Sequence, residues 1–89
     1  MVKHFDKPEQ QGSYLKWLKG NHANGFVANR WENGTVVFHH ASCYSLTTNP
    51  KYCKTTKQYS KLCGPIDELR ARVKKDWHPK NTKECGKCW

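Results

Sequence analysis

The cysteines are the feature of this sequence that most constrains how the chain can fold. Five occur among the 89 residues, and the last two form the segment Cys85-Gly-Lys-Cys88, one residue before the C-terminus. Only 36% of the residues are hydrophobic, so a chain of this length buries little apolar surface and needs a covalent or metal crosslink. The odd number of cysteines, together with an N-terminus that lacks the apolar segment of a signal peptide, favours metal-binding thiolates over a complete set of disulfides.

Zinc is the metal that these cysteines predict. Tetrahedral Zn²⁺ takes four Cys or His ligands, usually two from one C-x-x-C knuckle and two from elsewhere in the chain. Cys85 and Cys88 form the knuckle, and the segment His39-His40-Ala-Ser-Cys43 supplies further donors. A redox pair or a disulfide is the main alternative, and inert thiols are the third. A redox C-x-x-C begins a helix, whereas only one residue follows this one, so we expect a structural zinc site.

The dipeptide Asn33-Gly34 predicts a β-hairpin over residues 25–40, because it is the strongest signal for a two-residue type I′ turn. A two-residue loop fixes the register of the strands and therefore the side chains that share a face. The expected apolar face carries Val27, Asn29, Trp31, Val36, Phe38 and His40. His39 would then lie on the other, more polar face, so it is open which of the two histidines could reach a metal.

Two stretches have the periodicity of helices. Residues 14–19 follow Ser13, a good N-cap, and precede Gly20. A longer helix begins at Gly64-Pro65 and stops before Pro79. Its apolar stripe consists of Ile66, Leu69, Val73 and Trp77.

The fold class that follows is a small α+β domain over residues 13–89, stapled by zinc. We expect a helix, an antiparallel hairpin or three-stranded sheet with its third strand near residues 58–63, a second helix and a C-terminal zinc knuckle. Residues 1–12 show no periodicity and are expected to form an irregular arm.

The charge of the chain predicts a polyanionic partner. Sixteen Lys and Arg against seven Asp and Glu give a net charge of +9, and no acidic residue occurs between Glu32 and Asp67. Lysines and tyrosines interleave in residues 51–61, where ammonium groups could hold phosphates while rings stack on bases. The residues expected to bind nucleic acid, DNA in particular, are Lys51, Tyr52, Lys54, Lys57, Tyr59, Lys61, Arg70 and Lys74. The alternative for any single lysine is a solvated side chain.

Two other classes of function are open. Four tryptophans in a chain of this length would suit a protein-interaction or regulatory domain that docks on a nuclease or toxin, provided that several are exposed. An enzyme would use His39 or His40 as a base and Cys43 as a nucleophile, or a zinc ion with an open position. Catalysis is the less favoured class, because no carboxylate stands near residues 39–43 to orient an imidazole. No apolar run approaches the length of a membrane span, and we expect a cytoplasmic protein.

The order of several motifs resembles a small, poorly characterised bacterial domain that occurs alone or attached to restriction-type and other DNA-processing proteins. The motifs, spread over residues 13–88, are Tyr14-Leu-x-Trp17, Gly25-Phe26-Val27-x-Asn29, Phe38-His39-x-Ala-Ser-Cys43, Lys61-Leu-Cys63 and Cys85-x-x-Cys88. By position, the resemblance implies five candidates for four metal-ligand places, namely His39, Cys43, Cys63, Cys85 and Cys88. It favours His39 over His40 and leaves Cys53 outside the pattern. Cys63 has the alternative role of a small buried apolar residue.

Overall fold

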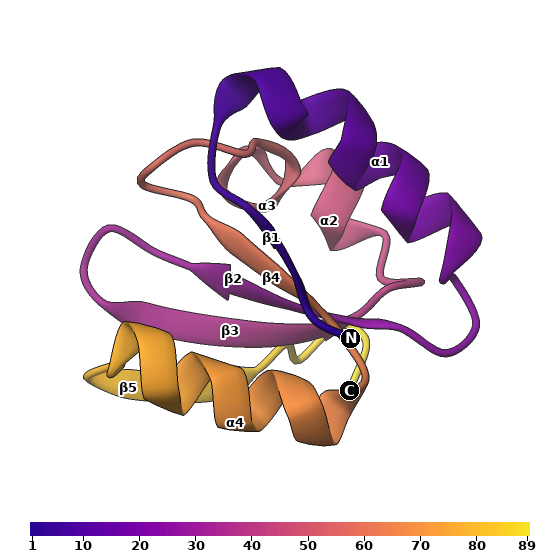
Figure 1. Ribbon diagram of the computed structural model, residues 1–89. Coiled ribbons are helices and arrows are strands. Elements are labelled where there is room, and N and C mark those ends of the chain that lie inside the picture. The colour runs from indigo at the N-terminus through magenta and orange to yellow at the C-terminus, as the bar shows by residue number, and fades with distance from the viewer.

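A five-stranded mixed sheet forms the centre of the computed structural model, which describes the backbone of residues 1–89 and every side chain except those of residues 50 and 51 (Figure 1). The strands are β1 (Lys3–Phe5), β2 (Phe26–Arg30), β3 (Thr35–His40), β4 (Lys61–Gly64) and β5 (Asn81–Glu84). The helices are the 3₁₀ helix η1 (Pro8–Gln10), α1 (Gln11–Gly20), α2 (Ser45–Thr48), α3 (Pro50–Cys53) and α4 (Ile66–Trp77). The strand order is β1-β4-β2-β3-β5, in which β5 runs parallel to β3 and all other neighbours are antiparallel. The α+β class is confirmed, while the expected two or three strands are too few.

Helices cover both faces of the sheet, with α1, α2 and α3 on one side and α4 on the other (Figure 1). Alternate residues of the hairpin strands therefore enter two separate cores. Val27 and Val37 belong to the core under α1 and α2, which also contains Tyr14, Leu18 and Leu46. The core under α4 consists of Ala28, Val36, Phe38, Leu62, Leu69 and Val73. Because both faces are buried, β2 and β3 lack the polar face that sequence analysis expected.

The hairpin differs from its prediction by one residue in register. The backbone N–H of Gly34 donates to the carbonyl of Trp31 at 3.1 Å, and the N–H of Trp31 donates to the carbonyl of Thr35 at 2.8 Å. The loop therefore has three residues and ends on Gly34, whose φ of 89° is the left-handed conformation that such loops place on glycine. Phe26 now pairs with His40, so His40 and Phe38 share a face with Phe26 and Ala28, while Val27 shares the other face with His39.

The N-terminal segment is ordered, contrary to the expectation of an irregular arm over residues 1–12. Strand β1 pairs with β4, and Phe5 is buried with its ring 5.7 Å from that of Tyr14. Gln10 then accepts hydrogen bonds on its side-chain oxygen from the backbone N–H groups of Asp6 and Lys7. Helix α1 starts at Gln11, ahead of the expected N-cap. A three-residue strand is too short to show a period, so only its partner β4 defines it.

Residues 66–89 contain one element that was predicted and one that was not. Helix α4 occurs where the apolar stripe places it and buries Leu69 and Val73. It ends at Trp77, and the next residue, His78, has a φ of 44°. Strand β5 was missed because all four of its residues are exposed and polar. None of the helices in the described residues has the length and apolar character of a membrane span.

Candidate metal centre

His39, Cys43, Cys85 and Cys88 converge where β3 and β5 end. Their ligand atoms, one imidazole nitrogen and three Sγ atoms, all lie within 4.8 Å of one another; Cys88 is half-buried and the other three residues are buried. Cys43 Sγ and Cys85 Sγ are 3.8 Å apart, far beyond a disulfide bond of about 2.0 Å. Two sulfurs bound to a tetrahedral zinc at about 2.3 Å are also about 3.8 Å apart. The cluster could therefore hold a metal ion such as zinc.

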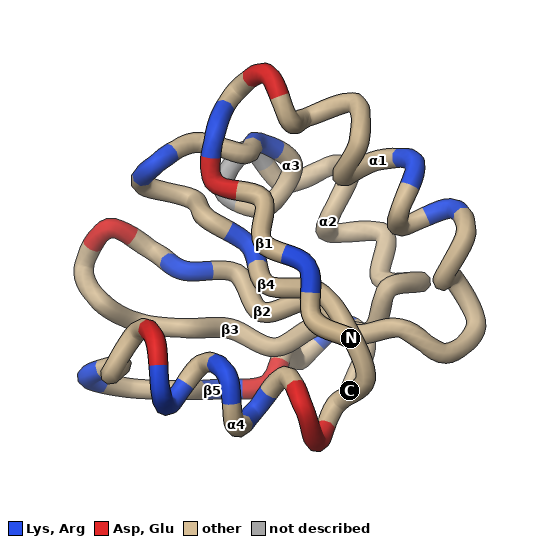
Figure 2. Tube along the Cα trace, viewed as in Figure 1, with Lys and Arg blue, Asp and Glu red and all other residues tan. Residues whose placement is uncertain are grey.

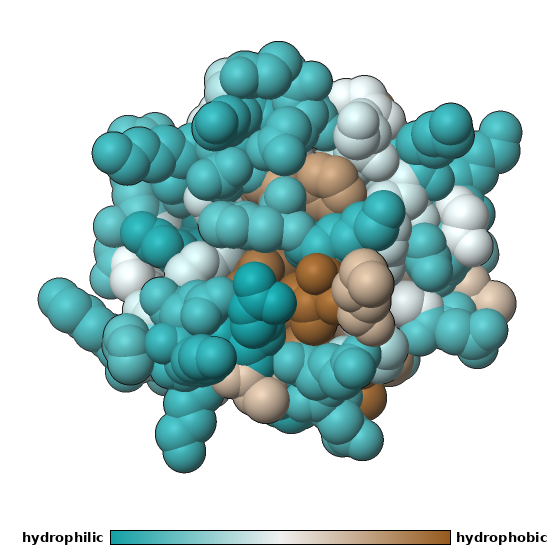
Figure 3. All heavy atoms as spheres, viewed as in Figure 1, coloured by the Kyte–Doolittle hydropathy of each residue, from teal (hydrophilic) through white to brown (hydrophobic). Residues whose placement is uncertain are grey.

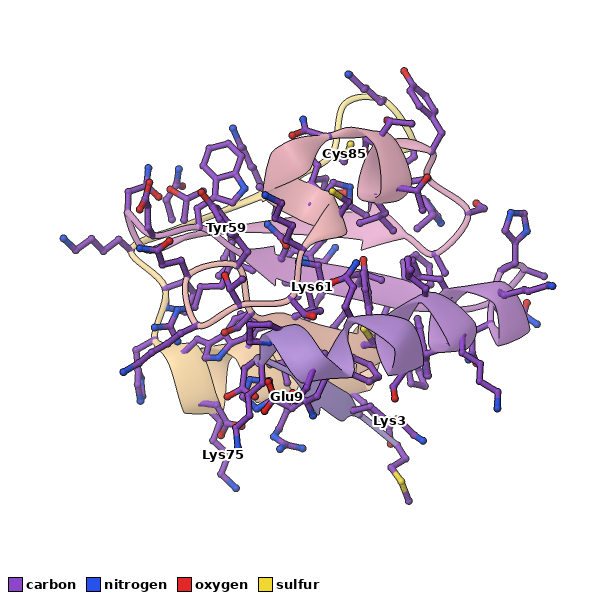
Figure 4. The ribbon with its side chains drawn as sticks, turned by 90° about the horizontal axis from the view of Figure 1, so that it is seen from above. Lys3, Glu9, Tyr59, Lys61, Lys75 and Cys85 are labelled. Atoms are coloured by element: carbon purple, nitrogen blue, oxygen red, sulfur yellow. The ribbon has the colours of Figure 1, made fainter. Side chains whose placement is uncertain are left out.

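Backbone hydrogen bonds bring these four residues together. The parallel register pairs Glu84 with Phe38, and the N–H of Cys85 continues the ladder by donating to the carbonyl of Phe38 at 2.8 Å. Cys43 follows β3 in a turn that its own N–H closes on the carbonyl of His40 at 2.9 Å. The C-terminal turn is closed by the N–H of Trp89, which donates to the carbonyl of Cys85 at 3.1 Å. Figure 4 shows Cys85 where the C-terminal segment passes beside the α2 and α3 helices.

Ser45 is a member of this site that sequence analysis missed. It is fully buried, and its Oγ lies 2.9 Å from Cys43 Sγ, 3.8 Å from Cys85 Sγ and 3.5 Å from His39 Nδ1. A hydroxyl in that position can donate a hydrogen bond to a thiolate and so support its negative charge. No spacing rule singles out this serine, because only the short helix α2 turns it toward the sulfurs.

The thiols of the knuckle differ in acidity. Burial raises the pKa of Cys85, but hydrogen bonds from the backbone N–H of Lys87 and from Ser45 together bring it below the ordinary thiol value. Burial and a hydrogen bond to Cys43 raise the pKa of Cys88 to about 12. Of the two knuckle thiols, Cys85 therefore ionises more readily, and a bound cation would favour the thiolate form of both.

His39 is held as a neutral imidazole. Burial, assisted by the charge of Lys61, lowers its pKa to about 4. The ring meets the Tyr52 ring edge-on at 4.4 Å between centroids, and Nε2 is buried without a hydrogen-bond partner among the described residues. A neutral imidazole is the form that binds metal. His40, in contrast, faces the α4 side and contacts the rings of Phe26 and Trp89, each at 4.7 Å. The register thus resolves the choice between the two histidines in favour of His39.

Cys63, the fifth candidate, does not belong to the group of four. It lies on β4 opposite Val27 and is fully buried. Burial raises the pKa of its thiol far above the ordinary range, against the opposing effect of the Lys61 charge. This is the environment of an inert, apolar cysteine, the alternative that sequence analysis left open.

The residues expected to bind nucleic acid do not form one continuous strip. Lys54 and Lys57 are exposed and Tyr59 is half-buried, whereas the side chain of Lys51 lies outside those that the structure describes. Tyr52 is only 9% exposed, and its ring packs against the His39 ring. Arg70 and Lys74 are exposed on α4, across the sheet from residues 51–61.

Lys61 is the clearest departure from the expected strip. It is 0% exposed, and its Nζ donates hydrogen bonds to the backbone carbonyls of Lys54 and of Tyr59, the latter at 2.7 Å. Nζ also lies 5.3 Å from the centre of the Tyr14 ring. Figure 4 shows Lys61 inside the molecule near the loop that follows α3. In this structure its charge holds the backbone of that loop and is not available to a phosphate.

Comparison of this chain with protein-family models, with curated proteins and with solved structures finds no match. The resemblance of its motifs to a bacterial domain therefore stays a prediction.

Proposed function

We propose that this chain is a structural zinc domain in which His39, Cys43, Cys85 and Cys88 hold one Zn²⁺. The observation that carries the proposal is the convergence of one neutral imidazole and three sulfurs within 4.8 Å. Three Cys and one His form a standard structural zinc set, and four protein ligands leave no open position for the water that catalytic zinc needs. A structural role therefore fits the donor set better than hydrolysis.

The proposed ion has a clear task, which is to hold the C-terminal segment against the sheet. All four residues of β5 are exposed, so this strand buries no side chain of its own. It is attached by backbone pairing with β3 and by the turn that carries Cys85 and Cys88. Metal coordination adds to folding free energy because the ligands are not preassembled in the unfolded chain.

The zinc proposal is tested by metal analysis of the purified protein. We expect one zinc per chain in the wild type and in the control Cys53→Ser, which removes a thiol outside the cluster. Cys85→Ser should contain little or none. Because that variant could fail to fold, Co²⁺ substitution of the wild type gives a second measurement: tetrahedral thiolate coordination produces intense visible absorption. If the protein, with its thiols kept reduced, takes up neither zinc nor cobalt, the proposal is overturned.

We also propose that the domain binds nucleic acid, on the basis of charge that the fold leaves unneutralised. Among the Lys and Arg side chains that the structure describes, Arg72 alone forms an ion pair with a carboxylate, that of Asp76. Figure 2 shows Lys and Arg on α1, on α4 and on the loops. Free cations of this kind hold phosphates and release counterions, which gives binding a steep dependence on salt.

The protein-interaction alternative has less support on the face of the molecule that Figure 3 shows. Figure 3 shows hydrophilic side chains over most of this face, with a small hydrophobic area near its centre. Three of the four tryptophans pack against the two cores as partly buried side chains, and Trp89 alone is substantially exposed, at 45%. Docking surfaces usually present larger contiguous apolar patches.

Nucleic-acid binding is tested by fluorescence anisotropy with a labelled single strand and a duplex of equal length. The logarithm of the association constant should fall linearly with the logarithm of the salt concentration. Absence of binding to both probes at low salt would refute this second proposal and leave the zinc proposal intact.

A further inference from the structure

The α4 side of the sheet carries an exposed aromatic ring beside the metal centre. Trp89 folds back so that its ring lies 4.7 Å from the His40 ring and 5.6 Å from the Phe26 ring, between centroids. It stays 45% exposed, and its backbone is tied to Cys85 by the hydrogen bond that closes the C-terminal turn. An aromatic side chain that neighbouring rings hold in place, while 45% of it stays exposed, suits stacking on a planar ligand.

Arg70 lies next to this ring. Its guanidinium carbon is 5.7 Å from the centre of the Trp89 ring and 4.9 Å from the centre of the Phe38 ring. Arg70 is exposed and has no carboxylate within ion-pair distance among the described residues. The rings therefore fix the guanidinium in place while its hydrogen-bond donors stay free for an anion.

A groove of about 390 Å³ continues from Arg70 between α4 and β5. Lys74 and His78 line it from the helix side and Thr82 from the strand, with Phe38 beneath. Arg70 and Lys74 are four residues apart on α4, so they share one face of the helix. No carboxylate is among the residues that line the groove. The acidic residues near these positions in the sequence, Glu68 and Asp76 on α4 and Glu84 on β5, are outside the lining of the groove.

We propose that this surface, defined by Arg70, Lys74 and Trp89, binds single-stranded nucleic acid. A backbone phosphate is held between Arg70 and Lys74, and an adjacent base stacks on the exposed part of the Trp89 ring. Charge complementarity supports an anionic ligand, and the exposed ring requires an unpaired base, because a duplex keeps its bases stacked within the helix. The inference rests on the proposed nucleic-acid function and names its site, which lies across the sheet from the lysines of residues 51–61.

The test compares the affinity of variants for a labelled 12-nucleotide oligothymidylate and for a duplex of equal length. Arg70→Gln and Trp89→Ala should each weaken single-strand binding at least about five-fold, as loss of a charged hydrogen bond or of a stacked base does. Trp89→Phe should retain most of the affinity, because phenylalanine still stacks. Lys16→Gln on α1 and Lys54→Gln are matched controls that remove one exposed charge elsewhere. They should weaken binding less than two-fold, as expected of charges outside the site.

The outcomes separate the two proposals. If the wild type binds the single strand but Arg70→Gln loses no more affinity than Lys16→Gln, the surface around Arg70 is not the binding site. The proposal that the domain binds nucleic acid would still stand. If Lys54→Gln shows the larger loss, the interface lies on the α3 side, as the sequence predicted. Duplex binding as tight as single-strand binding would also overturn the stacking role of Trp89. Unchanged zinc content and melting temperature in each variant show that the knuckle and the fold are intact.

Discussion

The buried charge of Lys61 makes the stability of this protein depend on pH in a direction that can be worked out. Burial lowers the pKa of Lys61 from the ordinary lysine value of 10.5 to about 8, although the charges of nearby cysteines oppose the change. The native state therefore binds this proton less tightly than the unfolded state. A pKa difference of that size lowers the free energy of unfolding by about 3 kcal/mol, and this destabilisation is fully present well below pH 8.

Between about pH 8 and pH 10.5 the unfolded chain still holds the proton that the native chain has released. The free energy of unfolding should therefore rise with pH across this window. Linkage with these two pKa values gives a gain of about 1 kcal/mol between pH 7 and pH 9. The cysteines act in the opposite direction, because burial raises the pKa of Cys63 and the unfolded state loses that proton first.

Lys61→Met isolates the contribution of the lysine, since methionine retains the packing on Tyr14 and removes the titrating group. Urea unfolding at pH 7, 8 and 9 of both proteins gives the difference in free energy of unfolding at each pH. The wild type should gain about 1 kcal/mol relative to the variant from pH 7 to pH 9, while titrations that both proteins share cancel. The loss of hydrogen bonds to the carbonyls of Lys54 and Tyr59 shifts all values equally. A difference that stays constant or falls as the pH rises would refute the reasoning.

Other changes have simpler expected outcomes. Leu69→Ala should lower the free energy of unfolding by about 3 kcal/mol, because this side chain of α4 is fully buried between the helix and the sheet; a loss under about 1 kcal/mol in urea unfolding would contradict this packing. Gly34→Ala should cost about 1 kcal/mol, since its φ of 89° strains any side chain, whereas Gly12→Ala, in α1 with open space around it, should be neutral or stabilising. Comparing the melting temperatures of these two variants decides whether the backbone conformation of Gly34 or the lack of space for a side chain causes the loss of stability. Chelation should lower the melting temperature of the wild type and of Cys53→Ser but not that of Cys85→Ser, and equal shifts in all three would rule out the proposed ligand.

Helix α4 and the hairpin could be predicted from the sequence, because their signals lie in neighbouring residues. Leu69 and Val73 repeat with the period of a helix, and both are buried where α4 packs on the sheet. The hairpin was also predicted, since its turn signal is contained in neighbouring residues. Its register was not, because a two-residue loop and a three-residue loop ending on Gly34 are both compatible with the same dipeptide.

The two edge strands could not be predicted in this way. Strand β1 is defined by its pairing with β4, more than fifty residues away in the sequence, and Phe5 is its only buried residue. Strand β5 has no buried side chain at all. Such segments are specified by the free hydrogen-bonding edge of the neighbouring strand, which exists only after the centre of the sheet has formed.

The expected strip of lysines and tyrosines is interrupted by buried residues for a related reason. Lys61 pairs with Phe5 across β1 and β4, so both side chains lie on the face that α1 covers. Tyr52 is carried by the short helix α3 against His39. Both residue types combine a long apolar body with a polar tip, and the sequence does not distinguish a tip that reaches solvent from one that reaches a backbone carbonyl.

The candidate metal site depends on the same register as the sheet. The three-residue loop puts His39 on the face that α1, α2 and α3 cover, and the β3–β5 pairing places Cys85 one residue beyond the partner of Phe38. A shift of β5 by one residue would turn Cys85 toward the α4 face, since side chains alternate along a strand. Strand β5 buries nothing that could resist such a shift. In the proposed zinc-bound state, coordination by Cys85 and Cys88 supplies that resistance, so the ion fixes the register of the strand and, through it, the position of Trp89.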